Sequence, residues 1–382
     1  MIPKTYCPYP FISSSLQADN TVLPCGQFMK SIHFKKVIPI NEVRNGEFMK
    51  SMREKMLNGE HVEGCQCPAE EAAGMRSMRQ SAIEKFGFTT ETKLKKLELV
   101  FDNVCNLKCR SCGSPNSHLW YEDELEIYGE GLIGKKYVKN SLYKEVDFEH
   151  LEYIEILGGE PMVSPGTEEF FTTAKNLGIL GNLNIQMSTN GMEKPSGNML
   201  EAVKNCKTLS MDISIDAFGE YNNYVRSGSD WHKIISNMEY YNTLIDERPL
   251  GSTKFSVHTT VSIYNANQLN LLQDFVKENF PRFGYSEQVL QFPVFMSIKN
   301  TPQNYKDQIR DKINNPGIVS YMDSGGDDLF SHFISYSDKL DDLRKEYIGN
   351  HNMFLQKFIT DYPKKENFNK EIFLKFLDTI RN

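Results

Sequence analysis

The sequence predicts an α/β fold, a partial (β/α)6 barrel of the TIM type, between a cysteine-rich N-terminal module and a helical C-terminal extension. The first observation is that apolar and amphipathic segments alternate from residue 93 to residue 298. This alternation is typical of parallel strands joined by right-handed helical crossovers. The second is that short polar or glycine-containing motifs follow several apolar segments, where barrels of this type hold their ligands. The third is that the alternation is missing on both sides of this region.

The pattern predicts six strands with five helices between them. The predicted strands are residues 97–102, 153–158, 183–189, 209–215, 254–263 and 289–295. The predicted helices are residues 114–128, 165–178, 197–206, 230–246 and 266–279. Three domains follow from this division, at residues 1–92, 93–298 and 299–382.

The two flanking regions have their own patterns. In the N-terminal module we expect a hairpin between Cys7 and Cys25 and a helix over 48–57, whose methionines at helical spacing predict core packing. In the extension, amphipathic segments at 331–334, 340–343, 354–358 and 372–377 predict about three helices.

Composition restricts the function classes. The 382 residues carry 43 Lys and Arg against 50 Asp and Glu, a formal charge of -7, which argues against a dedicated nucleic-acid binder. No apolar run reaches the roughly 20 residues that span a bilayer, and the N-terminus lacks the apolar core of a signal peptide. We therefore expect a cytoplasmic protein without a membrane segment. The oligomeric state cannot be predicted from this sequence.

Seven of the eight cysteines fall into two groups. Cys105, Cys109 and Cys112 are spaced C-x3-C-x2-C directly after a predicted strand. Three thiolates suit an iron–sulfur cluster and leave one of its four irons without a cysteine, open for chemistry. The eighth cysteine, Cys206, stands alone and is predicted to be a buried small hydrophobic residue.

The second group of cysteines lies in the N-terminal module. Cys7 and Cys25 flank the predicted hairpin, and Cys65 and Cys67 form a tight C-x-C turn. In a reducing compartment, four such cysteines indicate a metal site rather than disulfides. Their spacing alone fits zinc and an iron–sulfur cluster equally well.

Polar motifs follow three further strands. Gly158, Gly159, Glu160 and Pro161 come after the second predicted strand. Glycines allow a close backbone approach, and a carboxylate accepts hydrogen bonds from an ammonium group. Segments 188–191 and 214–217 follow the third and fourth strands, and Arg226 lies ten residues beyond Asp216. Taken one at a time, these motifs are also typical of ordinary turns.

The triplet and the Gly-Gly-Glu-Pro segment together resemble the signature of the radical S-adenosylmethionine (SAM) enzymes. The resemblance covers about residues 95 to 295. It implies that Cys105, Cys109 and Cys112 hold a [4Fe–4S] cluster whose open iron binds SAM. It also implies SAM contacts from eight residues: Gly158, Gly159, Glu160, Pro161, Ser188, Asn190, Ser214 and Arg226. Glu160 would hold the amino group of SAM, and Arg226 its carboxylate. Asp216 is the one candidate catalytic residue.

The N-terminal module resembles the twitch or SPASM-type modules of the same enzymes. The resemblance rests on Cys7, Cys25, the close cysteine pair and the segment 74–77, and implies a second [4Fe–4S] cluster that transfers electrons. Two departures from the family pattern stand out. The module precedes the barrel instead of following it, and Ser111 occupies a position where relatives carry an aromatic residue that contacts adenine. His118, Trp120 and Tyr121 are predicted to be packing residues without a role in the site.

The resemblance therefore predicts an enzyme that cleaves SAM reductively to a 5′-deoxyadenosyl radical, which abstracts a hydrogen atom from a small molecule or a peptide. A reductant such as flavodoxin or ferredoxin would supply the electron. Two other classes stay open at this point: an iron–sulfur electron-transfer or sensor protein without SAM chemistry, and a zinc-binding structural protein.

Overall fold

The computed structural model describes residues 2–28, 40–72, 76–326 and 328–362. Within them, the chain folds around one eight-stranded sheet with the order β2-β1-β3-β4-β5-β6-β7-β8. The strands are β1 Ser13–Leu16, β2 Val22–Leu23, β3 Lys96–Leu99, β4 Tyr153–Ile156, β5 Asn184–Thr189, β6 Thr208–Ser214, β7 Thr253–Val261 and β8 Gly284–Val289. All neighbouring strands are parallel except the β1–β2 hairpin.

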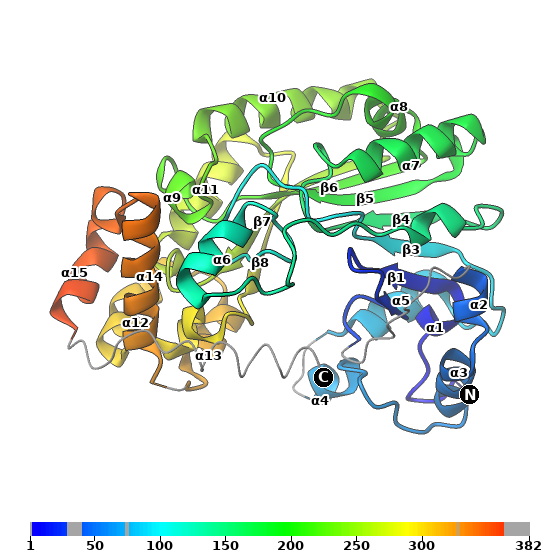
Figure 1. Cartoon of the computed structure of the whole chain (residues 1–382), viewed down its shortest axis with the longest axis horizontal. Coiled ribbons are helices and arrows are strands. Elements are labelled where there is room, and N and C mark those ends of the chain that lie inside the picture. The colour runs from blue at the N-terminus through cyan, green and yellow to red at the C-terminus, as the bar shows by residue number, and fades with distance from the viewer. Residues whose placement is uncertain (1, 29–39, 73–75, 327, 363–382) are drawn as a thin grey trace.

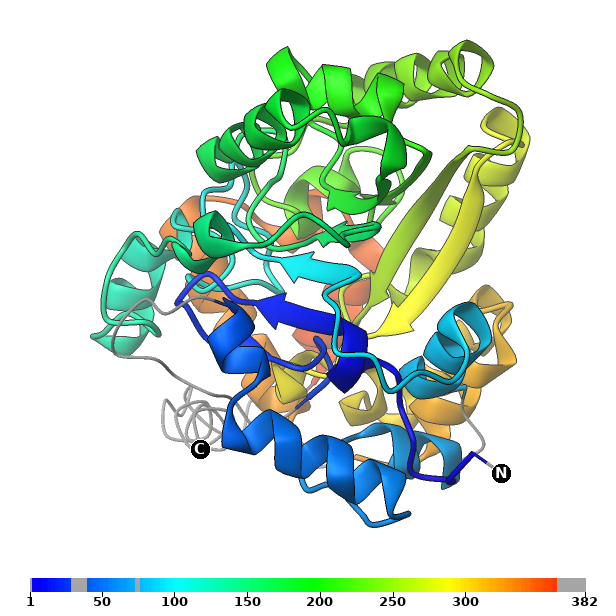
Figure 2. The same cartoon turned by 90° about the vertical axis from the view of Figure 1, so that its right-hand side faces the viewer.

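The sheet curves into an open barrel from β1 to β8 (Figure 2). This confirms the predicted fold class, because β3 to β7 correspond to the first five predicted strands. Their carboxyl ends meet at one rim, so the loops after β3, β4, β5 and β6 come together there. The predicted motifs of the SAM site all follow these four strands.

The N-terminal hairpin is part of the same sheet. It was predicted between Cys7 and Cys25, and β1 and β2 confirm it. β1 also pairs in parallel with β3, with Ser13 opposite Lys96 and Leu16 opposite Leu99. The hydrogen bonds between β1 and β3 therefore cross the predicted domain boundary at residue 92. The division of the chain into three domains stays a prediction.

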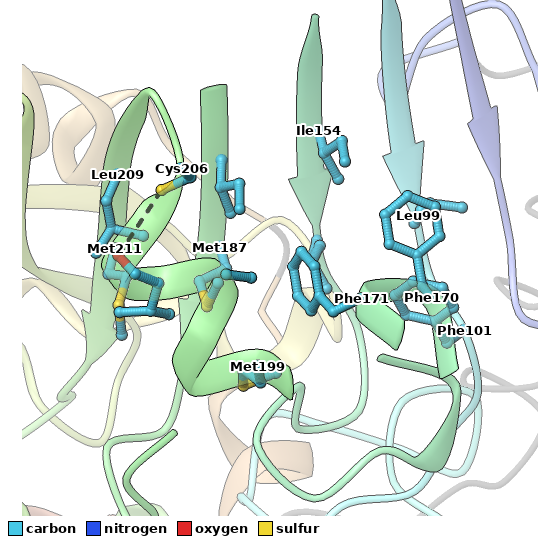
Figure 3. Close-up of a cluster of buried hydrophobic side chains, with 14 of the residues drawn as sticks. Leu99, Phe101, Ile154, Phe170, Phe171, Met187, Met199, Cys206, Leu209 and Met211 are labelled. Carbon is cyan, nitrogen blue, oxygen red and sulfur yellow. Dashed lines mark hydrogen bonds between the residues drawn. The ribbon is translucent and has the colours of Figure 1, made fainter. Parts of the chain in front are cut away.

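Helices cover the outer face of the sheet and bury the main core (Figure 1). They are α7 Pro165–Asn176, α8 Gly197–Asn205, α10 Trp231–Glu247 and α11 Leu269–Asn279. Alternate strand residues such as Leu99, Ile154 and Met187 face them and are fully buried, as Figure 3 shows beside Phe170 and Phe171 of α7. Cys206 lies in this core, which confirms the prediction of a buried small residue.

The remaining helices form the two flanking regions and the barrel rim. They are α1 Tyr9–Ile12, α2 Ile40–Arg44, α3 Glu47–Leu57, α4 Cys67–Ala72, α5 Met78–Phe86, α6 Trp120–Tyr128, α9 Tyr221–Val225, α12 Gln303–Ile309, α13 Pro316–Asp323, α14 Phe330–Arg344 and α15 Met353–Asp361. α3 confirms the predicted helix over 48–57, and its methionines Met49, Met52 and Met56 are buried as expected.

The sixth strand was predicted in the wrong place. β8 covers Gly284–Val289, whereas the prediction was 289–295, and Val294–Met296 forms a short 3-10 helix. The apolar run that begins at Val289 suggested a buried strand, but it enters the core as a loop. β8 itself is an edge strand with few apolar residues, so the signal on which the prediction relied is weak there.

In the extension, the predicted segments 331–334 and 340–343 are two parts of one helix, α14, and 354–358 lies in α15. The predicted segment 372–377 falls outside the described residues. None of the helices described here is long and apolar enough to cross a bilayer.

Candidate functional site

The three cysteines of the triplet lie on a loop after β3, residues 105–112, here called the triplet loop. Two aromatic residues hold this loop, His118 in the turn before α6 and Trp120 at the first position of α6. The Cys105 amide donates to Nδ1 of His118 at 3.3 Å, and the Trp120 indole donates to the Cys109 carbonyl at 2.9 Å. Spacing alone suggested packing roles for His118 and Trp120, so their bonds to the triplet loop were not foreseen.

The triplet loop forms one wall of a cavity of about 190 Å³ at the C-terminal rim of the sheet, here called the triplet cavity. Its lining residues come from the ends of β3, β4, β5 and β6. They are Cys105, Leu107, Cys109, Cys112, Asn116, Gly158, Gly159, Glu160, Ser188, Thr189, Asn190, Ser214 and Arg226. All three cysteines of the triplet and seven of the eight predicted SAM contacts are in this set. Pro161 is not, since it borders a neighbouring cavity between the starts of α7 and α8.

The two glycines after β4 permit close packing, Gly158 against the Val100 side chain and Gly159 against the backbone just before the triplet loop. Gly158 and Gly159 have φ angles of +69° and +53°, a region that L side chains rarely adopt. A Cβ atom on Gly159 would lie 2.5 Å from the carbonyl oxygen of Val104, directly before Cys105. The Glu160 amide then donates to that same carbonyl at 2.8 Å. Any side chain at position 159 would therefore collide with the backbone that leads into the triplet loop and would displace it.

The Glu160 carboxylate is fully buried and joins the ends of β4 and β5. It accepts hydrogen bonds from the Thr189 hydroxyl at 2.7 Å, the Asn190 amide at 2.6 Å and the Met162 amide at 3.1 Å. Burial raises the pKa of Glu160, and these donors oppose that shift. A carboxylate offers about four acceptor positions, so about one remains for a ligand in the cavity.

Arg226 reaches the triplet cavity from the segment after α9. Its Nη1 donates to Asp216 at 2.8 Å, and Asp216 also accepts the Thr260 amide at 2.9 Å. Asp216 is therefore buried and holds Arg226, and it does not line the cavity itself. The Nε of Arg226 is buried and has no hydrogen-bond partner among the described residues. A buried donor left unpaired is costly, and a ligand with an acidic group would satisfy it.

The triplet thiols lie in surroundings that favour the neutral form. Burial raises the pKa of Cys105 to about 12 and also raises the pKa values of Cys109 and Cys112. Arg226 opposes the shift at each of them. Metal ligation requires thiolates. A bound metal centre would therefore stabilise the negative charges of the three thiolates, which the protein alone does not favour.

The four N-terminal cysteines surround a second, much smaller cavity, here called the N-terminal cysteine cavity. Its other lining residues are mostly apolar. The full lining is Cys7, Tyr9, Pro10, Pro24, Cys25, Phe28, Met52, Met56, Cys65, Cys67, Met78 and Arg79. The predicted grouping of these cysteines is therefore seen in space. Cys7 and Cys25 lie towards the N-terminal end of β1, whereas the triplet loop follows the opposite end of β3.

The thiols of this second cavity differ in their surroundings. Burial raises the pKa of Cys7 and of Cys25 to about 12. A hydrogen bond from the Cys65 thiol lowers the pKa of Cys67 below that of an ordinary thiol. Within the described part of the chain, no group of three or more His, Cys, Asp or Glu side chains is arranged to hold a single metal ion. Of the segment 74–77 that contributed to the resemblance, Gly74 and Met75 lie outside the described residues, and Ser77 caps α5.

Comparison with known families adds to this geometry. Residues 99–261 match the family model described as the Radical SAM superfamily. This region runs from the last residue of β3 to the end of β7 and includes every residue of the triplet cavity. The match covers less than half of the chain, and the N-terminal cysteines and α12 to α15 lie outside it.

Several solved structures are also similar to the chain at low identity. One is anSMEcpe with bound AdoMet and the Cp18Cys peptide, at 17% identity and a TM-score of 0.37, where the match covers 66% of this chain and 61% of the other. Another is SuiB from Streptococcus suis bound to S-adenosylmethionine, at 15% identity and a TM-score of 0.33, covering 79% and 68%. The chain thus spans less than two thirds of the length of anSMEcpe. No curated protein sequence matches it significantly.

Proposed function

We propose that the protein is a radical SAM enzyme. The observation that carries this proposal is the triplet cavity, in which three cysteines and seven predicted SAM contacts from four separate strand ends meet. The fold brings these loops together, and the thiols, carboxylate and guanidinium that they carry are the groups that a cluster and an amino acid ligand need. The match to the Radical SAM superfamily model supports the same chemistry in general.

The residues present fit a [4Fe–4S] cluster with SAM. Cys105, Cys109 and Cys112 would ligate three irons, and the unpaired Nε of Arg226 would meet the SAM carboxylate. Glu160 has room for one more donor, which the SAM amino group would supply. When bound and reduced by one external electron, this pair of groups would supply a 5′-deoxyadenosyl radical through cleavage of a carbon–sulfur bond, for hydrogen-atom abstraction from the substrate.

The chain's own part is to hold and orient these groups. Asp216 fixes the direction of Arg226, and the Thr189 and Asn190 donors fix the Glu160 carboxylate. Ser188, Asn190 and Ser214 line the cavity as polar partners for the ribose and carboxylate of SAM. Asp216 acts through Arg226, which makes it a positioning residue in this proposal.

We further propose a second [4Fe–4S] cluster in the N-terminal cysteine cavity, as in a twitch or SPASM-like module. The support is that four thiols share one mostly apolar cavity. With four cysteine ligands no iron would be left for the substrate, so this cluster would transfer electrons. The substrate would be a small molecule, with a peptide as the other class, and flavodoxin or ferredoxin would supply electrons in the cytoplasm.

The experiment is anaerobic reconstitution with iron and sulfide, followed by addition of SAM with and without dithionite. We expect 5′-deoxyadenosine to form only with the reductant, and the Cys109→Ala variant to form none. Cys206→Ala is the matched control, because it removes a thiol from the core far along the chain from the triplet loop. A fully reconstituted protein that forms no 5′-deoxyadenosine would contradict the enzyme proposal, and zinc in place of iron would favour a structural protein.

A further inference from the structure

A group of charged side chains, most of them buried, lies behind the triplet loop and outside the triplet cavity. Three of its members come from the C-terminal end of α14 and the residues after it: Asp341, Arg344 and Glu346. We call these three the C-terminal clasp. They lie about 80 residues or more beyond the region that matches the Radical SAM superfamily model, which ends at residue 261.

Two acidic residues of the clasp hold an arginine of the triplet loop. Arg110 lies between Cys109 and Cys112 and is completely buried. Its Nη2 lies 2.7 Å from the Asp341 carboxylate and 3.2 Å from that of Glu346. A buried guanidinium needs such partners, since removing one leaves an uncompensated charge. The loop between the second and third cysteines is therefore tied to the extension.

The third member of the clasp contacts the triplet loop from another side. Arg344 Nη1 donates to the Lys108 carbonyl at 2.8 Å, and its Nε donates to Asp123 of α6 at 2.8 Å. Its guanidinium also lies 4.3 Å from the ring centre of Trp120, whose indole donates to the Cys109 carbonyl. Arg344 thus contacts the backbone on one side of Cys109 and supports the residue that bonds to Cys109 itself.

The clasp also binds the segment that carries Arg226. Arg344 Nη1 donates to the Ser227 hydroxyl at 2.9 Å, and this hydroxyl donates to Glu346 at 2.7 Å. The Tyr224 hydroxyl donates to Asp341 at 2.9 Å. Each clasp residue therefore contacts both the triplet loop and the Tyr224–Ser227 segment.

We propose that the C-terminal clasp positions the triplet loop and Arg226 relative to one another, so that the cluster and the carboxylate partner of SAM stand at the right separation. Arg344 and Asp341 are positioning residues in this inference, because neither lines the triplet cavity. The inference rests on the proposed function for the identity of the ligands. The region that matches the Radical SAM superfamily model would accordingly depend on the extension for its SAM site.

The test compares Arg344→Gln with Arg344→Lys and with the control Arg310→Gln, which removes an exposed arginine of the same extension. The readouts are iron content, Tm, the KM for SAM, the kcat for 5′-deoxyadenosine and the electron paramagnetic resonance (EPR) spectrum of the reduced cluster. For Arg344→Gln we expect retained iron, a KM raised about tenfold, as loss of roughly 1.4 kcal/mol implies, and an altered spectrum. Arg344→Lys keeps the charge and should recover part of the KM, whereas Arg310→Gln should match the wild type.

A Ser227→Ala variant serves as the second probe if Arg344→Gln does not fold, since it removes one bond to each of two clasp residues. The inference is overturned if the folded variants keep the wild-type KM and EPR spectrum. It is also overturned if they lose iron and Tm while the KM of the remaining holoprotein is unchanged, because the role is then only structural. Failure of the proposed function looks different: the wild type itself would make no 5′-deoxyadenosine. The EPR spectra recorded without SAM would still decide whether the clasp positions the loop.

Discussion

At the scale of single residues, the site depends on backbone positions as much as on side chains. Gly159 allows the β4 loop to contact the carbonyl of Val104, and the next residue, Glu160, bonds to that carbonyl. The order Gly-Gly-Glu therefore has a physical reason. The glycine brings the β4 loop against the triplet loop, and the carboxylate then reaches β5.

The first prediction concerns Gly159→Ala, with Gly178→Ala as its control. Both glycines have positive φ, so each substitution costs stability on the order of 1 kcal/mol. A Cβ at Gly178 meets nothing within 4 Å, whereas one at Gly159 meets the Val104 carbonyl at 2.5 Å. Both variants should lower Tm, but only Gly159→Ala should abolish 5′-deoxyadenosine formation. Equal activity in the two variants would show that contact with the triplet loop is unimportant.

Individual site residues could be predicted from the sequence where the type of residue and its spacing indicated the same site. Cysteine is rare and spaced regularly in the triplet, and Gly158 to Glu160 follow a clear strand. Thr189 could have been predicted as a cavity residue, since it lies inside the polar segment 188–191 that follows the third predicted strand. The bonds of His118 and Trp120 to the triplet loop could not have been predicted. They depend on how the chain folds back at the start of α6, and the spacing of residues along a helix carries no information about that fold.

At the scale of elements, α14 combines packing with a buried titratable group. His332 is buried on α14 with its ring 4.9 Å from that of Phe295, and burial lowers the pKa of His332. Above pH 6.5 the imidazole is neutral in both the folded and unfolded states. Below that pH the unfolded state takes up the proton first, so the free energy of unfolding falls as the pH falls.

The second prediction is that His332→Gln weakens this pH dependence. Between pH 7.5 and pH 5.5 the wild type should lose more stability than the variant, by at most about 1.4 kcal/mol per pH unit from this one group. Chemical denaturation of the holoprotein at both pH values measures the difference. His61→Gln is the control because His61 is exposed, and it should follow the wild type. Parallel curves for His332→Gln and wild type would contradict the prediction.

Strands could be predicted from the sequence where helices bury one of their faces, and the prediction failed for β8 at the edge of the sheet. β4, β5 and β6 show strong alternation and were placed to within two residues at each end. β8 reads Gly-Tyr-Ser-Glu-Gln-Val and has no such pattern. The pairing of β1 with β3 is a contact between distant segments, which local periodicity does not reveal.

At the scale of the whole molecule, two cysteine-lined cavities lie at opposite ends of the first strands of the sheet, and only the triplet cavity lies in the region that matches the Radical SAM superfamily model. The extension contacts that region through the C-terminal clasp. Sequence composition indicated three regions, but it could not show that the first shares a sheet with the second or that the third binds the triplet loop.

The third prediction concerns Cys65→Ala. If the N-terminal cysteine cavity holds a four-iron cluster, reconstituted wild type should contain about eight irons per chain and the variant about four. The variant should still form 5′-deoxyadenosine, because its triplet cavity is intact, while conversion of the substrate should stop. Iron and sulfide analysis checks the first part, with Cys206→Ala as the control. An unchanged iron content in Cys65→Ala would contradict a second cluster at this position.

The central claim is that the triplet leaves one iron open and that SAM occupies it through its amino and carboxylate groups. The most direct measurement is pulsed EPR of the reduced cluster with SAM labelled by 15N at the amino group. If SAM binds the open iron directly, wild type and Cys206→Ala should show a hyperfine coupling between the reduced cluster and the 15N nucleus. Cys109→Ala should show none. A reduced cluster in the wild type that shows no coupling to the label, with SAM at saturating concentration, would contradict it.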